Sequence, residues 1–245
     1  MRILLLADIH ANWPALAAIN EPHDLCICLG DLVDYGVEPL QCIEWVRDHC
    51  QYVIRGNHDH AVAQNIVATG DIGYRLLARA TRPLMWQMLG AEERTYLARL
   101  PITLNLRLDG YDFYLVHATP RDPLDEFLLD DAAQWERRLQ GNEAQFVCVG
   151  HTHKQFMLQL NGCLLINPGS VGQPRDGDPR AAYAIIENGQ VELKRAEYDL
   201  ERTVAAIESA PILSEAKQLA AHVLRTGGMN QNGGIRGQNG INGGS

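Results

Sequence analysis

Five short polar segments, each placed at the end of an apolar run, constrain this chain more than any other feature. The run Arg2–Ala7, for example, is followed directly by Asp8 and His10. Short apolar runs bounded by turn residues are typical of buried strands, so the pattern predicts oxygen and nitrogen ligands gathered at the edge of a sheet. The segments are Asp8-Ile9-His10, Gly30-Asp31-Leu32-Val33-Asp34, Gly56-Asn57-His58-Asp59, His117, and Gly150-His151-Thr152-His153.

Apolar runs alternate with amphipathic stretches along the chain, which predicts an α/β fold. Three pairs of runs flank Asp109-Gly110, Asn161-Gly162 and Asn188-Gly189, which are strong hairpin signals. We therefore expect two packed mixed sheets with helices outside. The expected strands are Arg2–Ala7, Asp24–Leu29, Tyr52–Ile54, Ile102–Leu108, Tyr111–Val116, Phe146–Val149, Gln155–Leu160, Cys163–Ile166, Ala181–Glu187 and Gln190–Tyr198.

The amphipathic stretches between the strands predict the helices. Pro14–Ile19 and Val37–His49 fit a helical pattern, and each has a proline suited to its first turn. Residues 59–100 are helical by pattern, with breaks expected near residues 70–73, Pro83 and Gly90. Residues 200–225 predict one or two C-terminal helices split near Pro211, and the Gly- and Asn-rich residues after 226 predict a flexible tail.

Charge and composition exclude several classes of partner. The chain has 245 residues and a formal net charge of −9, so it offers no broad cationic surface for a nucleic-acid backbone, and we expect no stable nucleic-acid binding. No signal peptide or bilayer-spanning run is visible, which predicts a cytoplasmic protein without a membrane partner. A small phosphorylated substrate, possibly a nucleotide, stays compatible with this charge, and the oligomeric state is left open.

The ordered motif set resembles the calcineurin-like metallophosphoesterase superfamily, whose pattern is DxH, GDxxD, GNHD or GNHE, a lone H, and GHxH. Asp8-Ile9-His10-Ala11-Asn12 and the stretch from Asn167 to Arg175 are similar to the small single-domain prokaryotic branch of phosphodiesterases and diadenosine-tetraphosphatase-like proteins. The resemblance covers about residues 1–198 and implies a four-layer αββα sandwich. It implies a metallophosphoesterase domain over residues 1–198, while pattern and composition predict a C-terminal helical extension over 199–226 and a flexible tail over 227–245.

The resemblance also implies a dinuclear metal centre. Carboxylate, amide and imidazole ligands without thiolates suit two divalent ions, Mn²⁺ first, with Fe, Zn²⁺, Ni²⁺ or Co²⁺ also compatible. Two such ions leave the site net positive after two carboxylates and a bridging hydroxide, so a phosphate anion is attracted and the hydroxide can attack phosphorus in line. One ion would be held by Asp8, His10, Asp31 and His153, and the other by Asp31, Asn57, His117 and His151, with Asp31 as the bridge.

Local spacing supports these roles. Period-two alternation at a strand end would place Asp8 and His10 on one face. Asn57 and His58 are neighbours that would point opposite ways in an extended segment, which leaves His58 to protonate the leaving oxygen, the role that the resemblance gives it. Asp34 matches the residue that orients this histidine in relatives, although it could instead cap the following helix.

Other polar residues allow two interpretations. Asn12 could contact substrate or cap a helix before Trp13-Pro14. Arg175 follows a Gly-rich loop and could contact phosphate or make a surface salt bridge. His60 fits an exposed helix position or a ligand of a third metal, and Asp59 fits a second-shell carboxylate or a helix N-terminal charge.

Several functions compete with that of a small-molecule phosphodiesterase. Phosphomonoesterase, protein phosphatase and dinucleoside polyphosphate hydrolase share the chemistry, but Tyr35 stands where the protein Ser/Thr phosphatases of the superfamily carry a phosphate-gripping arginine. A nuclease of the recombination-repair type is disfavoured by the acidic charge. A metal-binding scaffold, as in the retromer complex, is disfavoured because His58 and all seven ligand positions are present.

Overall fold

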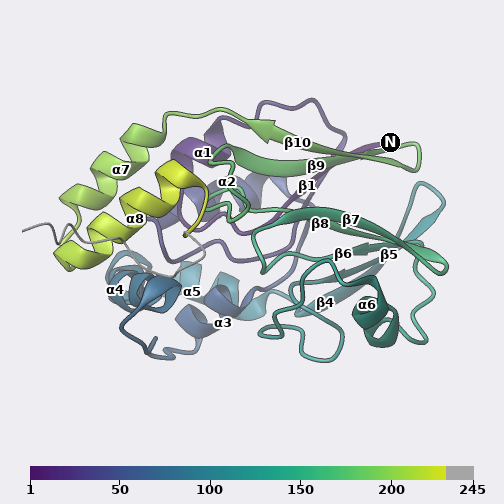
Figure 1. Cartoon of the computed structure of the whole chain (residues 1–245), viewed down its shortest axis with the longest axis horizontal. Helices are drawn as coiled ribbons and strands as arrows, with labels where there is room; N and C mark the ends of the chain where they lie inside the picture. The colour runs from purple at the N-terminus through teal and green to yellow at the C-terminus, as the bar shows by residue number, and fades with distance from the viewer. Residues whose placement is uncertain (230–245) are drawn as a thin grey trace, which may run out of the picture.

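The computed structural model describes residues 1–229, and two mixed five-stranded sheets form its centre (Figure 1). The first sheet has the order β10-β9-β1-β2-β3. β1 pairs in parallel with β2, which pairs in parallel with β3, while β9 is antiparallel to both β1 and β10. Its strands are β1 (Arg2–Leu6), β2 (Leu25–Cys28), β3 (Tyr52–Val53), β9 (Ala181–Glu187) and β10 (Gln190–Ala196).

The second sheet has the order β4-β5-β6-β8-β7. β5, β6 and β8 are parallel, and the antiparallel strands β4 and β7 form the two edges. Both sheets therefore contain a parallel centre, whose carboxyl ends are the usual place for ligands in α/β proteins. The strands are β4 (Thr103–Leu108), β5 (Tyr111–Val116), β6 (Phe146–Cys148), β7 (Gln155–Leu160) and β8 (Cys163–Pro168).

Three apolar layers hold the sheets and helices together. Leu5 of β1 lies in the layer between the sheets with Phe113 of β5, while the alternate side chain Leu4 packs on the other side of β1 against helices. Trp135 packs on the outer face of the second sheet. β1 is thus apolar on both faces, as expected for a central strand covered on both sides. The result is the four-layer αββα sandwich, which confirms the expected fold class.

Helices cover the two outer faces and one end of the molecule. α1 and α2 pack on the first sheet, and α6 covers the second. Figure 1 shows α4, α7 and α8 gathered at the end away from the N-terminus, and α8 packs against both α4 and α7. The helices are α1 (Trp13–Ala17), α2 (Pro39–His49), α3 (Asn57–Ala63), α4 (Gly73–Met88), α5 (Ala91–Arg99), α6 (Ala132–Arg138), α7 (Leu200–Ser209) and α8 (Ser214–Thr226).

Two local predictions were wrong. The break expected at Pro83 does not occur, because α4 continues through it to Met88. Leu76 and Leu77 before the proline and Met85 after it are buried, and this packing outweighs one lost hydrogen bond. α6 was not foreseen; Asp131 caps it, and the buried side chain of Trp135 anchors it to the sheet.

The C-terminal segments lie close to the other helices. Gly227 ends α8 in the left-handed conformation, and its carbonyl accepts a hydrogen bond from Gly177.

Residues 230–245 of the predicted tail lie outside the described residues, and the division into domain, extension and tail stays a prediction. Within residues 1–229, no helix is long and apolar enough to cross a membrane.

Candidate metal centre

The candidate ligands leave their strands through left-handed turns. Asp8 and Asp31 follow the ends of β1 and β2 with φ values of 54° and 57°, and His10, His151 and His153 also have positive φ. Few residues other than glycine adopt this conformation, and it tends to cluster at functional sites. The prediction that strand alternation aligns Asp8 with His10 was therefore wrong, because turns in the backbone bring them together.

Two glycines let these turns approach one another. A Cβ on Gly30, whose φ is +93°, would lie 2.3 Å from the backbone nitrogen of Gly56. A Cβ on Gly56 would lie 2.0 Å from Oδ1 of Asp31. Any side chain at either position would push the loops apart, so glycine is needed to place Asp31 beside the loop that carries Asn57.

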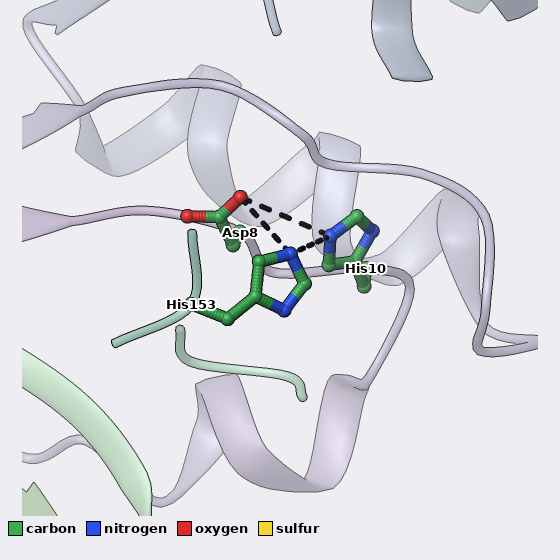
Figure 2. Close-up of side chains that lie close together, drawn as sticks. All are labelled: Asp8, His10 and His153. Atoms are coloured by element: carbon green, nitrogen blue, oxygen red, sulfur yellow. Dashed lines mark hydrogen bonds and ion pairs between the residues drawn. The ribbon is translucent and has the colours of Figure 1, made fainter. Parts of the chain in front are cut away.

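The first cluster of candidate ligands is deeply buried. Figure 2 shows the carboxylate of Asp8 and the rings of His10 and His153 turned toward one another. Nε2 of His10 lies 3.0 Å from Nε2 of His153, which lies 3.4 Å from Oδ1 of Asp8. Two imidazole nitrogens and a carboxylate oxygen that converge in this way form a suitable cage for a cation.

The second cluster lies next to the first and is more open. Nε2 of His117 lies 3.3 Å from Oδ2 of Asp31 and 3.2 Å from Oδ1 of Asn57, and His151 completes the group. The same Oδ2 lies 3.8 Å from Nε2 of His10 in the first cluster. It is buried and has no hydrogen-bond partner. An orphaned carboxylate oxygen between two ligand groups fits a bridging ligand.

Backbone carbonyls orient three of the histidines. Nδ1 of His10 lies 2.8 Å from the Val33 carbonyl, and Nδ1 of His117 lies 2.8 Å from that of Leu29. Nδ1 of His153 lies 2.7 Å from the carbonyl of Gln173. A proton held on Nδ1 by a carbonyl leaves Nε2 unprotonated and available to a metal, which is a common second-shell arrangement.

The electrostatics of the chain alone also favour bound cations. Burial lowers the pKa of His151 to about 3 and raises the pKa of Asp8 to about 7. Burial alone would lower the pKa of His117 as well, but the neighbouring Asp31 carboxylate outweighs it and brings the pKa to about 10. In the chain alone a proton on His117 thus compensates Asp31, and a bound cation would replace that proton and favour the neutral imidazoles and ionised carboxylates that bind metals.

His58 lies beside this cluster and pairs with a carboxylate. It sits in the first turn of α3, so the extended segment assumed for Asn57 and His58 was wrong. Its Nδ1 lies 2.6 Å from Oδ2 of Asp34. Asp34 does not cap the following helix, whose N-cap is Glu38. Burial alone would lower the pKa of His58, but the carboxylates of Asp31 and Asp34 raise it by more than burial lowers it. The net shift of this pKa is therefore upward.

Arg82 of α4 completes this group and was not foreseen from the sequence. Its Nε donates to Oδ1 and Oδ2 of Asp34 at 3.0 and 2.8 Å, and its Nη1 donates to the carbonyl of Ile66 at 2.9 Å. Arg82 is only 4% exposed and sits on the buried stripe of α4 with Ala78 and Met85. A charged residue on an otherwise apolar helix stripe was the signal that could have revealed it.

Asp59 holds two loops of the site together through backbone hydrogen bonds. Its carboxylate accepts hydrogen bonds from the backbone nitrogens of Asp31 and Leu32, both at 2.8 Å, and of Gly56 at 3.1 Å. It thereby joins the two loops that carry Asp31 and Asn57. Because these bonds occupy both of its oxygens, Asp59 faces the backbone and not the candidate ligands.

Arg175 lies over aromatic rings at the edge of the site. Its guanidinium carbon is 3.5 Å from the ring centre of Tyr74 and 5.5 Å from that of Tyr35. Nη2 donates to Gln173 at 3.0 Å, whereas Nε is buried without a partner. Among the described residues, the guanidinium contacts of Arg175 are those with Tyr74, Tyr35 and Gln173, and none is a salt bridge. The surface salt bridge considered for it is therefore absent there.

Asn12 is saturated by contacts within the chain. Its Nδ2 donates to the carbonyl of Gly172 and to the hydroxyl of Tyr198 at 2.8 and 3.3 Å. Its Oδ1 accepts from the backbone nitrogen of Ala15, as an N-cap does, and from the hydroxyl of Thr203. Asn12 has no free amide group for a substrate, so we assign it to the scaffold that joins α1 to α7.

Comparison with known proteins gives a consistent result. Residues 1–190 match the calcineurin-like phosphoesterase superfamily domain. The uncharacterized protein MJ0912 of Methanocaldococcus jannaschii is 32% identical over 231 residues, which cover 84% of this chain and 91% of that protein. A metallophosphoesterase from Sphaerobacter thermophilus matches with a TM-score of 0.77 at 32% identity, over 93% of this chain and 99% of that one. Protein PH1004 from Pyrococcus horikoshii OT3 shares the fold, with a TM-score of 0.81 at 23% identity, over 94% and 99% of the two chains.

Proposed function

Because the chain belongs to the calcineurin-like phosphoesterase superfamily, we propose that it is a dinuclear-metal phosphodiesterase that hydrolyses a small phosphodiester. One observation carries the proposal: Oδ2 of Asp31 is buried and unpartnered between two groups of converging ligands. Asp8, His10, Asp31 and His153 would hold one ion, and Asp31, Asn57, His117 and His151 the other. We propose Mn²⁺ as the native metal because carboxylate and amide oxygens accompany the imidazoles and no thiolate is present; Fe, Zn²⁺, Ni²⁺ and Co²⁺ fit the same ligand types.

The two metals, when bound, supply Lewis-acid activation of the phosphorus and an activated water. The residues of the chain supply the rest. His58 donates a proton to the leaving oxygen, and Asp34 holds its ring in place through the 2.6 Å contact at Nδ1. Arg82 fixes Asp34 in turn. His58, Asp34 and Arg82 are all buried, so packing and not solvent sets the positions of their side chains.

Arg175 is the proposed contact for the substrate phosphate. Its Nε is unpartnered, and its guanidinium carbon lies 5.5 Å from the ring centre of Tyr35. Tyr35 occupies the sequence position of the phosphate-gripping arginine in related protein phosphatases, so this chain would present its cation from a different loop. One arginine suits the single negative charge of a phosphodiester better than the double charge of a monoester.

Turnover of two chromogenic esters tests the proposal. Bis-p-nitrophenyl phosphate and p-nitrophenyl phosphate should be compared with Mn²⁺ and with chelator. We expect metal-dependent hydrolysis in which the diester is cleaved faster. A faster monoester reaction would favour a phosphomonoesterase, and no turnover with both metals bound would favour a metal-binding scaffold. A cytoplasmic location stays a prediction.

A further inference from the structure

A cavity of about 380 Å³ opens beside His58. Its wall comes mainly from α3, from residues 66–69 and from α4, with Tyr35 and Asp125 beside them, and His58 itself forms part of the lining. The volume falls within the range of about 300–1,000 Å³ that is usual for small-molecule sites. We call its lining between residues 60 and 82 the cavity wall.

The cavity wall combines polar side chains with a group of apolar ones that lie at the surface. Ile66 and Val67 line it and are 48% and 68% exposed, and Ala61, Ala68 and Ala78 add further apolar surface. Exposed apolar side chains that gather around a cavity are more informative than single ones, because a ligand can cover them. This surface would pack against a flat, largely apolar group.

Apart from the proposed acid His58, the charges around the cavity balance. Arg82 shares the Asp34 carboxylate with His58. The other charged side chains in the lining are Arg75 and Asp125, which have opposite signs. His60 belongs to the lining, but its Nδ1 is buried from solvent, so the exposed hydroxyl of Thr69 supplies a polar contact. Away from His58, a neutral group with polar edges therefore fits better than an anion.

We infer that this cavity receives the departing alcohol of the substrate, and that this alcohol is a neutral, ring-bearing group of nucleoside size. The inference rests on the proposed function, in which His58 protonates the leaving oxygen. The alcohol must then lie on the His58 side of phosphorus, where the cavity is. The bond from phosphorus to this alcohol breaks, its oxygen takes a proton from His58, and the oxygen of water forms the new bond to phosphorus. The proton that the water gives up passes to solvent, from which His58 regains its own. The products are a phosphomonoester and the free ring-bearing alcohol.

Hydrolysis of thymidine 5′-methyl phosphate tests the orientation, because either of its two alcohols can depart. If the cavity receives the ring-bearing alcohol, the products are thymidine and methyl phosphate. Thymidine 5′-monophosphate and methanol would overturn the inference, as would failure to cleave this diester when bis-p-nitrophenyl phosphate is cleaved. Failure to cleave either diester with metals bound would refute the proposed function, and the inference with it.

A binding measurement tests the cavity without the metals. Thr69 lines the cavity at an exposed position, so Thr69→Trp should fill it without disturbing the core. Ile72→Trp is the matched control, since Ile72 is 79% exposed and outside the lining. In chelator, saturation-transfer NMR should detect thymidine on the wild-type protein and on Ile72→Trp, with a loss of at least about tenfold in Thr69→Trp. No binding to the wild-type protein, or equal binding to all three, would overturn the inference.

Discussion

The metal-ligand cluster and the cavity wall lie side by side but are built in opposite ways. The cluster consists mostly of buried side chains on turns that follow strands, with Asn57 added from the first position of α3. The cavity wall consists of helical and loop residues inserted between β3 and β4, with Ile66 and Val67 largely exposed. Under the proposed function, the sheets would fix the chemistry, whereas substrate choice would rest on a segment that can change without disturbing them.

Arg82 connects the two regions. It binds Asp34, which holds the proposed acid His58, and the carbonyl of Ile66 in the cavity wall. A structural change in the cavity wall can therefore affect the position of His58 through the side chain of Arg82. The predictions below separate what each region contributes.

The largest effect is expected from the shared ligand of the cluster. Asp31→Asn should remove both metals and with them detectable turnover, because Oδ2 of Asp31 lies within reach of both ligand groups. Asp8→Asn is the matched variant and should reduce the occupancy of one ion only. Elemental analysis of the purified proteins measures both. Loss of a single ion from Asp31→Asn would show that this carboxylate does not bridge.

The next effect is expected at the border of the two regions. His58→Ala should lower kcat by about 10²–10⁴-fold for a substrate with an alkoxide leaving group, which needs a proton. With p-nitrophenolate, which leaves without one, the loss should be much smaller. Steady-state kinetics with both kinds of ester give the comparison. Equal losses would mean that His58 positions substrate or metal and does not act as the acid.

A smaller effect, seen mainly in stability, is expected from Arg82. Arg82→Met leaves the buried Asp34 carboxylate without its main cation, which should cost about 3–5 kcal/mol of unfolding free energy. Arg79→Met, in the same helix but with a side chain 41% exposed, should cost at most about 1 kcal/mol. Urea unfolding measures both. A similar loss of unfolding free energy in the two variants would mean that Arg82 is not essential to the connection between the cavity wall and His58.

The same contrast explains what could be predicted from the sequence. Each proposed ligand lies within a few residues of a strand end, so a local pattern was enough to identify it, and the family is confirmed. The reason given for their convergence was wrong, because apolar patterning carries no information on left-handed backbone such as that of Asp8 and His10. Only the folded chain shows that Gly30 and Gly56 meet each other and bring the Asp31 turn against the loop that carries Asn57.

The cavity wall could not be predicted, because its contacts join distant residues. Arg82 and Asp34 are 48 positions apart, and no short motif links them. Arg175 contacts Tyr74, and the long stretch of chain between them contains all the strands of the second sheet. The continuity of α4 through Pro83 also depends on its packing, which overrides the local propensity to break.

A charged cluster at the opposite end of β1 gives the smallest effect on activity. Burial alone would raise the pKa of Glu21, but hydrogen bonds from Lys194, Arg2 and Tyr183 outweigh it and lower the pKa from 4.5 to about 2. Because the folded state holds this carboxylate ionised, its contribution to stability is complete above pH 4.5 and is lost as the pH falls toward 2. Glu21→Gln should therefore lower the melting temperature at neutral pH and flatten its decline in acid, with kcat unchanged.

Glu44→Gln, at an exposed position of α2, should keep the wild-type profile. Parallel melting profiles of Glu21→Gln and the wild-type protein between pH 2 and 7 would show that this cluster does not set the acid stability, and a fall in kcat would show that the two ends of β1 are not independent.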